Sequence, residues 1–408
     1  MRKIAGLSAR EDANFWVSAF EGANPLTVEL SNPHDCGSDI YGRVYIVDKE
    51  SHSVLRVSAD GSTITTIAGT HTLGNGPDIE MPAISVQLNN PNGLHVLADG
   101  TFYILDTGNQ KIRRVSNTGS CTTVLTYLNG FGAGRGLWVS ENEQTIYFCG
   151  EVVAGGNQNV MRFNPGSPPI VMARIPGGSN GLGNLDVAPD QSLGVTSAGG
   201  HRVYRIRGPG VAPVVIAGNG GTTGEPADGS PALSATLNRV RGIAFRSDGT
   251  YFLATQKGGD VWWIDLDANI HRFVSGGGSG NATVSKGSSR TSVGDKISEP
   301  RAINLATNGD LLIVSNDNGV VQAVNTTHRP PAAQFEVERD EAGAFSLKFR
   351  GHFDGRYLFE SSESLLPGSW EEEAVFTTQA PTTQRIPFLP TLRKKYWRLR
   401  VPSQAGGN

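Results

Sequence analysis

Short apolar runs alternate with turn residues along most of the chain. In one copy of the pattern, residues 91–96, 101–106 and 111–115 are strand-like runs of five or six residues, and Asp99-Gly100 and residues 107–109 separate them. Glycine and asparagine accept the positive φ of tight turns, so such pairs between apolar runs predict β-hairpins. No stretch shows a sustained helical period. The pattern therefore predicts an all-β protein.

The same succession of three strands occurs six times. The copies begin at Pro33, Pro91, Gly134, Leu182, Val240 and Pro300, at intervals of roughly 43 to 60 residues, and a period of this length indicates stacked units. After five of the six third strands, a turn leads into a fourth strand, near residues 63–68, 122–127, 169–175, 213–217 and 269–275. The sixth copy lacks one and runs into Pro330-Pro331, which cannot donate to a strand ladder.

A recurring triplet indicates where the missing strand lies. Ile-Ala-Gly ends the fourth-strand segments at residues 67–69 and 216–218, and the same triplet occurs at residues 4–6. We therefore predict that residues 2–6 complete the sixth unit and close a ring, which removes an open sheet edge. Roughly four backbone hydrogen bonds at about 1 kcal/mol each, with about 1.5–3 kcal/mol for burying Ile4, would contribute several kcal/mol to stability.

Residues 1–328 resemble a six-bladed β-propeller built from NHL repeats. The resemblance rests on the Pro-x-Gly-apolar opening of the repeat, the Asp-Gly turn, the segment LDTGNQKIRRV at 105–115 and long connections such as 218–237. The third copy departs most, with Cys149-Gly150-Glu151 where an aspartate would stand. The resemblance implies the fold but says little about activity, because one propeller scaffold carries many unrelated functions.

The sequence changes character from Pro330 onward. About six short strands in roughly 80 residues predict a small β-sandwich domain at 329–408. The segment resembles accessory modules appended to secreted bacterial proteins. We expect its aromatic residues Phe349, Tyr357, Trp370 and Trp397 to form a core and not a sugar-stacking surface, because a small sandwich must bury its aromatics.

Composition excludes several classes of protein. The chain has 408 residues, 38% hydrophobic residues and a net charge of −3, with no basic stripe that would indicate a nucleic-acid partner. No apolar run is long enough for a membrane span. Cys36, Cys121 and Cys149 form no CxxC pair, so we expect three small buried or half-buried thiols. The alternative is a single disulfide between two of them. We expect a secreted or periplasmic protein whose signal peptide is not present in this chain.

The chemistry is expected at the central opening, where the first strands of all blades converge. The second position of each repeat gives His34, Asn92, Arg135, Gly183, Arg241 and Arg301. Three guanidinium groups with an imidazole and an amide favour a carboxylate or sulfate. This pattern predicts an anionic ligand such as an acidic glycan or a small carboxylate, or a protein partner. Alternatively, the arginines pair with Asp35 or Asp186 or cap backbone carbonyls.

An enzymatic alternative stays open beside binding. Some NHL-like propellers are lyases or hydrolases with a channel-bound ion, so the resemblance implies a possible divalent metal or base at His34 and Asp35, acting on a polysaccharide or an ester-like bond. Zinc needs three converging protein ligands, and only His34 occupies the inner position. Alternation places His95 and Asp186 toward a blade interface. His52 and His201, which precede third strands, are interpreted as outward or inter-blade packing residues. Binding is favoured because no complete catalytic set can be named.

Overall fold

The computed structural model describes residues 2–7, 13–177, 180–274, 297, 299–316 and 319–326. Toward the C-terminus it also describes residues 335–339, 345–350, 356–363, 371–377, 383–388 and 396–400. The chain divides into two compact units. The first contains Met1–Phe245, Tyr251–Ile264 and Ala268–Thr327, and the second contains the turns Arg246–Thr250 and Asp265–Asp267 with His328–Asn408.

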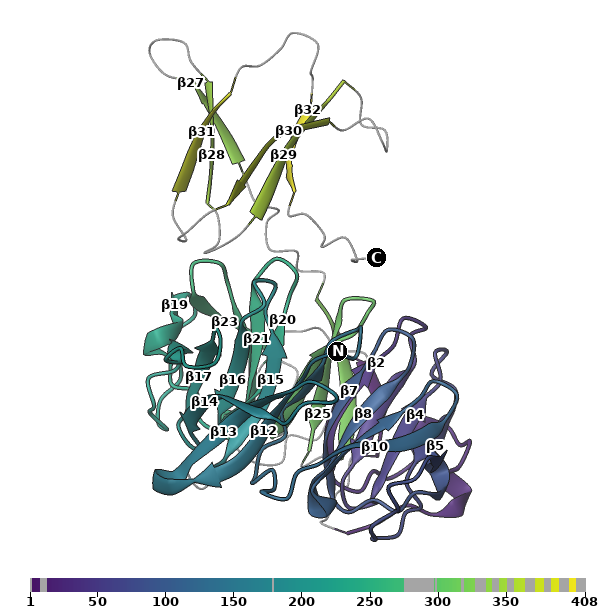
Figure 1. Ribbon diagram of the computed structural model, residues 1–408. Coiled ribbons are helices and arrows are strands. Elements are labelled where there is room, and N and C mark those ends of the chain that lie inside the picture. The colour runs from purple at the N-terminus through teal and green to yellow at the C-terminus, as the bar shows by residue number, and fades with distance from the viewer. Residues whose placement is uncertain are drawn as a thin grey trace. The chain divides into compact units, whose positions relative to one another are not determined.

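The first unit is a six-bladed β-propeller whose antiparallel sheets are arranged around a common centre (Figure 1). The innermost strands are β2 (Pro33–Ser38), β7 (Pro91–Val96), β11 (Leu137–Val139), β15 (Leu182–Val187), β20 (Val240–Phe245) and β24 (Pro300–Leu305). The second strands are β3 (Val44–Asp48), β8 (Phe102–Asp106), β12 (Ile146–Val153), β16 (Leu193–Ser197), β21 (Tyr251–Thr255) and β25 (Asp310–Ser315). The third strands are β4 (Ser53–Val57), β9 (Lys111–Val115), β13 (Asn157–Phe163), β17 (Arg202–Ile206), β22 (Asp260–Ile264) and β26 (Val320–Asn325).

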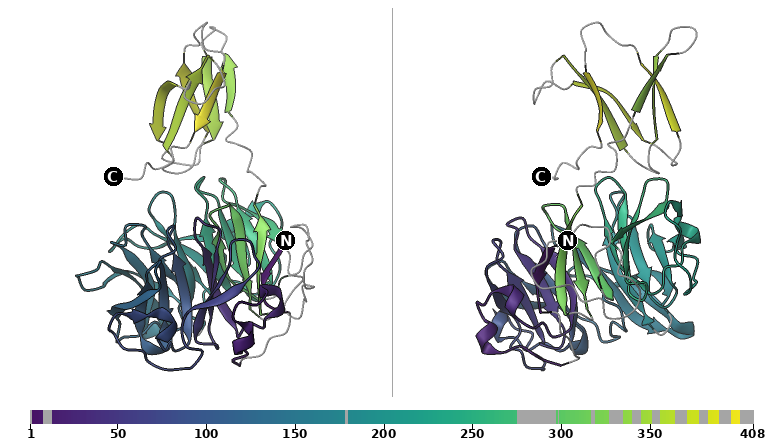
Figure 2. Two further views of the ribbon diagram at one scale, coloured as in Figure 1. Left: turned by 90° about the vertical axis from the view of Figure 1, so that its right-hand side faces the viewer. Right: turned by 180° about the vertical axis from the view of Figure 1, so that it is seen from behind.

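The outer strands confirm the predicted closure of the ring. They are β5 (Ile64–Ala68), β10 (Ser120–Thr126), β14 (Ile170–Pro176), β18 (Val214–Ala217), β23 (Asn269–Val274) and, in blade six, β1 (Arg2–Ala5). Strand β1 pairs antiparallel with β26, with Arg2 opposite Ala323 and Lys3 opposite Gln322 (Figure 2). Ile4 is only 6% exposed. The N-terminal strand therefore fastens the last blade, as the repeated Ile-Ala-Gly triplet predicted.

Two blades carry a fifth, very short strand that the sequence did not predict. Strand β6 (Met81–Pro82) pairs with β10 in blade two, and β19 (Ser230–Pro231) pairs with β23 in blade five. Both lie in long connections rich in turn residues. Two paired residues are too few to show an alternating pattern, which is why no strand was predicted at either segment.

The hydrophobic core lies between neighbouring blades. Each of the six interfaces in the described part of the propeller has its own cluster of buried residues. Alternation along β3 shows how one strand serves two interfaces. Val44 and Ile46 pack with blade six, whereas Tyr45 and Val47 pack with blade two. Stability of the ring is thus spread over six contacts between adjacent sheets.

The three cysteines occupy three different interfaces. Cys36 lies in the cluster between blades six and one, Cys121 in that between blades one and two, and Cys149 in that between blades three and four. All three are buried and free. The disulfide that the sequence left open is therefore not formed, and the thiols serve as small apolar residues.

The described part of the C-terminal unit consists of six strands in two antiparallel sheets. In one sheet the strand order is β27 (Phe335–Arg339), β28 (Phe345–Arg350), β31 (Thr383–Phe388). In the other sheet it is β30 (Glu371–Thr377), β29 (Arg356–Ser362), β32 (Tyr396–Arg400). The six expected strands are present, whereas their sandwich packing and the domain boundary at 328 stay predictions. The side chains of Phe349, Tyr357 and Trp397, and residue Trp370, lie outside the described residues. No helix in the described residues has the length and apolar character needed to cross a bilayer.

Candidate functional site

Most inner strands of the propeller are irregular at the second position of the repeat. In β2 the register shifts between Pro33 and Asp35, so His34 is an extra residue without a cross-strand partner. The equivalent register shifts in β7, β20 and β24 leave Asn92, Arg241 and Arg301 as extra residues in the same way. A β-bulge re-aims the side chain of its extra residue and releases it from the ladder. The bulges therefore position these side chains independently of the alternation along each strand.

Blade four supplies a residue that sequence reasoning missed. Its register shift lies between Leu182 and Leu185, where Gly183 and Asn184 together stand opposite Thr196 alone. Gly183 sits so close to blade five that an added Cβ would lie 2.3 Å from the Arg241 carbonyl oxygen. Asn184 provides the side chain instead, and its Nδ2 lies 3.5 Å from Asp35 Oδ1. In blade four the polar side chain of the bulge therefore lies one position further along the chain than in the other blades.

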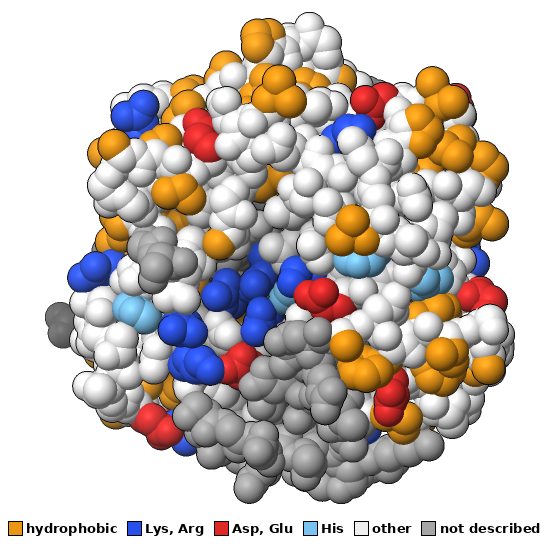
Figure 3. Space-filling view, turned by 90° about the horizontal axis from the view of Figure 1, so that it is seen from below, with side chains coloured by type: hydrophobic (Ala, Val, Ile, Leu, Met, Phe, Trp, Pro, Cys, Tyr) orange, Lys and Arg blue, Asp and Glu red, His pale blue; other side chains and the backbone are white. Residues whose placement is uncertain are grey.

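The three predicted arginines lie at one end of the central channel, each anchored through a different neighbour. Arg135 Nε donates to Asn92 Oδ1 at 3.1 Å, and Arg241 Nε donates to Gln256 Oε1. Lys and Arg side chains gather in a hollow at the centre of this face (Figure 3). Nη1 of Arg135 and Nη1 of Arg241 are buried and have no hydrogen-bond partner among the described residues. The site thus holds spare donors on side chains that are only 6% exposed.

Arg301 and a neighbouring carboxylate form the other side of this arginine cluster. Arg301 Nη1 lies 3.0 Å from His34 Nε2, and its Nη2 lies 3.5 Å from Glu299 Oε2. Glu299 also accepts from Gln256 Nε2 at 2.8 Å and from Lys257 Nζ. Burial acts to raise the pKa of Glu299, but hydrogen bonds from Lys257 and Gln256 and the charges of Lys257 and Arg301 lower it to about 2. Glu299 is therefore ionised at neutral pH and holds these cations in place.

Glu299, Gln256 and Lys257 were not found from the sequence. Glu299 precedes the sixth repeat and has a φ of +41°, a region that is unusual for a glutamate. Gln256 and Lys257 follow β21 in a turn. No motif links these positions, and the packing of blade five against blade six brings Gln256 and Lys257 beside Glu299 and Arg301. A charged residue placed directly before an inner strand was the one available signal.

The site carries excess positive charge in a buried setting. Burial, followed by the charges of Arg241 and Arg301, lowers the pKa of Arg135 well below its ordinary value. Burial and the charge of Arg301 likewise lower the pKa of Arg241. A depressed pKa of a base means that the fold disfavours its protonated form, yet guanidinium stays protonated in proteins. An anion bound here would relieve this repulsion.

His34 is neutral and oriented by Arg301. Burial, followed by the charges of Arg135 and Arg301, lowers the pKa of His34 well below its ordinary value. Since guanidinium can only donate, Nε2 of His34 must accept from Arg301 and the ring proton resides on Nδ1. Nδ1 is buried and has no partner among the described residues. His34 therefore presents a donor, which is a poor arrangement for the predicted base or metal ligand.

Two other expectations about carboxylates are corrected by the structure. Asp35, proposed as a partner of an arginine or as a metal ligand, accepts the backbone N–H groups of Cys36 at 2.9 Å and Leu94 at 3.1 Å. Asp186 accepts those of Val187 and Phe245 at 2.8 and 2.7 Å. Neither forms the expected ion pair, because each links its own strand to the next blade. No group of three His, Cys, Asp or Glu residues in the described part of the chain could hold a metal ion.

The interface predictions for the other histidines are confirmed. His95 packs beside Trp138 of the next blade, with ring centroids 5.7 Å apart. His52 Nδ1 accepts from the backbone N–H of Asn90 at 3.3 Å, and His201 Nδ1 accepts from that of Arg239 at 3.0 Å. The two equivalent turn histidines thus cap the start of the following blade.

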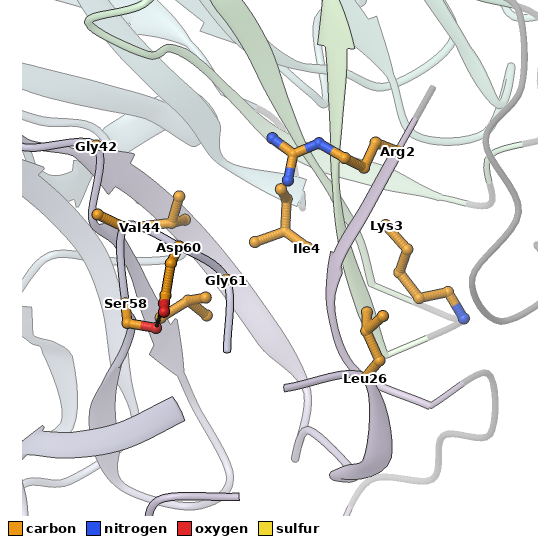
Figure 4. A pocket seen from close by; sticks show the side chains of 11 residues that line it. Arg2, Lys3, Ile4, Leu26, Gly42, Val44, Ser58, Asp60 and Gly61 are labelled. Atoms are coloured by element: carbon orange, nitrogen blue, oxygen red, sulfur yellow. Dashed lines mark hydrogen bonds between the residues drawn. The ribbon is translucent and has the colours of Figure 1, made fainter. Parts of the chain in front are cut away.

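A cavity lies away from the arginine cluster, where β1 meets blade one. It has a volume of about 350 Å³, and Figure 4 shows Arg2 and Ile4 on the side of β1 that faces Val44. The carboxylate that lines this cavity belongs to Asp60, and it accepts a hydrogen bond from the hydroxyl of Ser58 in the same turn at 2.6 Å. Since this carboxylate is engaged within its own turn, the cavity offers fewer converging polar groups than the arginine cluster.

Comparison with known proteins shows the fold. No protein-family model matches the chain, and no curated protein matches it. A structural genomics protein of unknown function from Bacteroides thetaiotaomicron is 16% identical, with a TM-score of 0.59 over 79% of this chain and 74% of that one. Auxiliary nutrient binding proteins from Bacteroides thetaiotaomicron and Bacteroides ovatus are 12% and 11% identical, with TM-scores of 0.55 and 0.54 over 79% of this chain and 75% of each of theirs. Likeness at such identity shows the propeller fold alone, and the resemblance to NHL repeats stays a prediction.

Proposed function

We propose that the propeller binds a carboxylate-bearing ligand at the arginine cluster formed by Arg135, Arg241 and Arg301. The observation that carries this proposal is the set of unpartnered, buried donors at one end of the channel: Nη1 of Arg135, Nη1 of Arg241 and Nδ1 of His34. Buried donors left without partners cost about 1–3 kcal/mol each. A ligand that accepts from them recovers this free energy and neutralises part of the charge.

The geometry favours a carboxylate group. Two of the arginines are held through Nε, by Asn92 and Gln256, which leaves their terminal nitrogens for the ligand. A guanidinium offers parallel N–H donors that match the two oxygens of a carboxylate. Both an acidic glycan and a small organic acid carry this group, and so does an acidic side chain of a protein partner. A location outside the cytoplasm is part of this proposal, and cell fractionation would test it.

A lyase or hydrolase at the same position has less support. Its base would be His34, whose Nε2 faces Arg301 at 3.0 Å and is therefore not free to take a proton from a substrate. Turnover of chromogenic esters or polyanionic glycans that is lost in His34→Gln would nevertheless establish the enzyme. Stoichiometric metal in the purified protein would point the same way.

Calorimetric titration with matched sugars tests the binding proposal. Galacturonate and galactose differ by a carboxylate, so we expect galacturonate to bind at least tenfold more tightly than galactose. Arg241→Gln should weaken galacturonate at least tenfold, because one terminal donor pair is lost. Arg174→Gln, at an exposed position of β14, serves as the matched control. Equal binding of both sugars, or equal affinity of Arg241→Gln and the parent, would contradict the proposal.

A further inference from the structure

A second cavity lies on the axis of the propeller, and all six inner strands contribute to it. Its volume is about 180 Å³. Apolar side chains form part of its wall, with Leu94, Leu137, Ile243 and Ile303 among the lining residues. Asp35 and Asn184 line it as well, and they connect it to the arginine cluster through the charge of Arg135 acting on Asp35. The cavity is a separate space of different composition along the same channel.

The carboxylates and one amide oxygen of this axial cavity are hydrogen-bond acceptors. Asn184 is 7% exposed, and its Oδ1 is buried without a partner among the described residues, because its amide nitrogen faces Asp35. Asp186 uses one lone pair of each carboxylate oxygen for backbone N–H groups, so further lone pairs stay available. His95 is held by the backbone of Val139. The lining thus contains two carboxylates and an unpartnered amide oxygen.

This composition is the reverse of that of the arginine cluster. There, spare donors surround the channel axis; here, spare acceptors do. We propose that the axial cavity binds a primary ammonium group carried on a short apolar body, with Asn184 Oδ1 and Asp186 as acceptors. This site is distinct from the proposed anion site, since none of the three arginines belongs to it and its ligand carries the opposite charge.

The size and walls of the cavity restrict the ligand. A water molecule occupies about 30 Å³ of liquid, so the cavity has space for roughly six waters or a molecule with about as many heavy atoms. An ammonium group has three donors and no acceptor, which suits the carboxylates of Asp35 and Asp186 and the unpartnered oxygen of Asn184. A neutral alcohol offers one donor and no charge to offset Asp35 and Asp186. The apolar walls accommodate a short alkyl chain.

Protonation of the carboxylates supplies a second readout. Burial raises the pKa of Asp35 and of Asp186 to about 7. The titratable groups that line the cavity are Asp35, His95 and Asp186, whereas the lining residues of β11, β20 and β24 contribute none. Burial lowers the pKa of His95 to about 4, so this ring stays neutral between pH 6 and 8. Since only ionised carboxylates attract an ammonium group, its affinity should fall as the pH drops through 7.

The test uses two probes of nearly equal size: propylammonium and 1-propanol. Ligand-observed NMR titration of the full chain should show propylammonium binding at least tenfold more tightly than 1-propanol, and about tenfold more tightly at pH 8 than at pH 6. The near-isosteric Asn184→Leu should weaken propylammonium at least tenfold, because it removes the unpartnered acceptor. Asn117→Leu, at an exposed position, is the control and should bind like the parent.

Further variants keep the test decisive. If Asn184→Leu fails to fold by circular dichroism, Asp186→Asn takes its place, with the same expected loss. Arg241→Gln should retain propylammonium binding, so failure of the anion site and failure of the axial cavity are distinguishable. Equal affinities for propylammonium and 1-propanol, or undiminished propylammonium binding in Asn184→Leu, would overturn the proposal.

Discussion

Replacing Arg135 by methionine should leave the empty protein as stable as the parent, or more stable, while it weakens anion binding. Arg135 is 6% exposed and shares a buried region with two other guanidinium groups. Its depressed pKa means that the protonated side chain is disfavoured in the folded state relative to the unfolded state. Since arginine is protonated in both states near neutral pH, this cost is constant there, and removing the charge removes it.

The magnitude follows from the contacts of the side chain. Arg135→Met loses the hydrogen bond from Nε to Asn92, and a bond to a charged donor contributes about 1.5–3 kcal/mol. It gains about 1–3 kcal/mol because the unpartnered Nη1 is no longer buried, and it relieves repulsion from Arg241 and Arg301. Replacement of buried charges by apolar groups of similar size is often neutral or stabilising by about 1–4 kcal/mol. We expect the free energy of unfolding to rise by between 0 and about 3 kcal/mol.

Urea unfolding of the propeller in a buffer without phosphate, sulfate or carboxylate measures this change. Tryptophan fluorescence and circular dichroism should report the same transition, so that the parent and variant are compared for one cooperative step. Arg174→Met, at an exposed position, should differ from the parent by less than about 0.5 kcal/mol. A loss of 2 kcal/mol or more in Arg135→Met would show that the guanidinium is a structural group, and the argument for a ligand would fail.

Three further outcomes are expected. Ile4→Ala should lower the free energy of unfolding by about 2–4 kcal/mol in urea, since Ile4 is 6% exposed in the closing strand, and an unchanged midpoint would refute its role in closure. Gly183→Ala should cost about 2 kcal/mol or more because the added Cβ meets the Arg241 carbonyl at 2.3 Å, whereas Gly208→Ala, with nothing within 4 Å, should not. Burial raises the pKa of Asp35 to about 7 in the folded state, so its stabilising contribution is present at low pH and lost as the pH rises from 4 to 7. The stability of Asp35→Asn relative to the parent should therefore increase by about 1–3 kcal/mol from pH 5 to pH 8, and a pH-independent difference would contradict this assignment.

The fold could be predicted because its signals are local and repeated. A turn pair between two apolar runs determines a hairpin without reference to the rest of the chain, and six copies of such a pattern determine a ring. The closing strand was predictable for the same reason, since Ile4 and Ala5 repeat a sequence found in two other blades. The two-residue strands β6 and β19 were missed because so short a pairing leaves no pattern.

The candidate site could be predicted only in part. The second repeat position brought Arg135, Arg241 and Arg301 together correctly, because equivalent positions of a ring face one axis. Asn184 was missed because the bulge of blade four lies one position later than the repeat indicates, a local irregularity that hairpin patterns do not encode. The partners of the arginines were missed because Gln256 and Glu299 lie outside the repeated strands. Pairing Asp35 with an arginine was wrong because backbone N–H groups of the chain compete for the same carboxylate.

The bulges of the inner strands explain why the fold can be predicted from the sequence while the identity of the ligand cannot. Most positions that face a neighbouring blade hold apolar residues, since they build six interface clusters. The second position differs in character between blades, with histidine, asparagine, glycine and arginine all represented. A residue released from the ladder contributes little to sheet pairing, so its identity is free to serve the chemistry of the channel. The donors of the arginine cluster and the acceptors of the axial cavity can therefore change with little effect on the propeller that holds them.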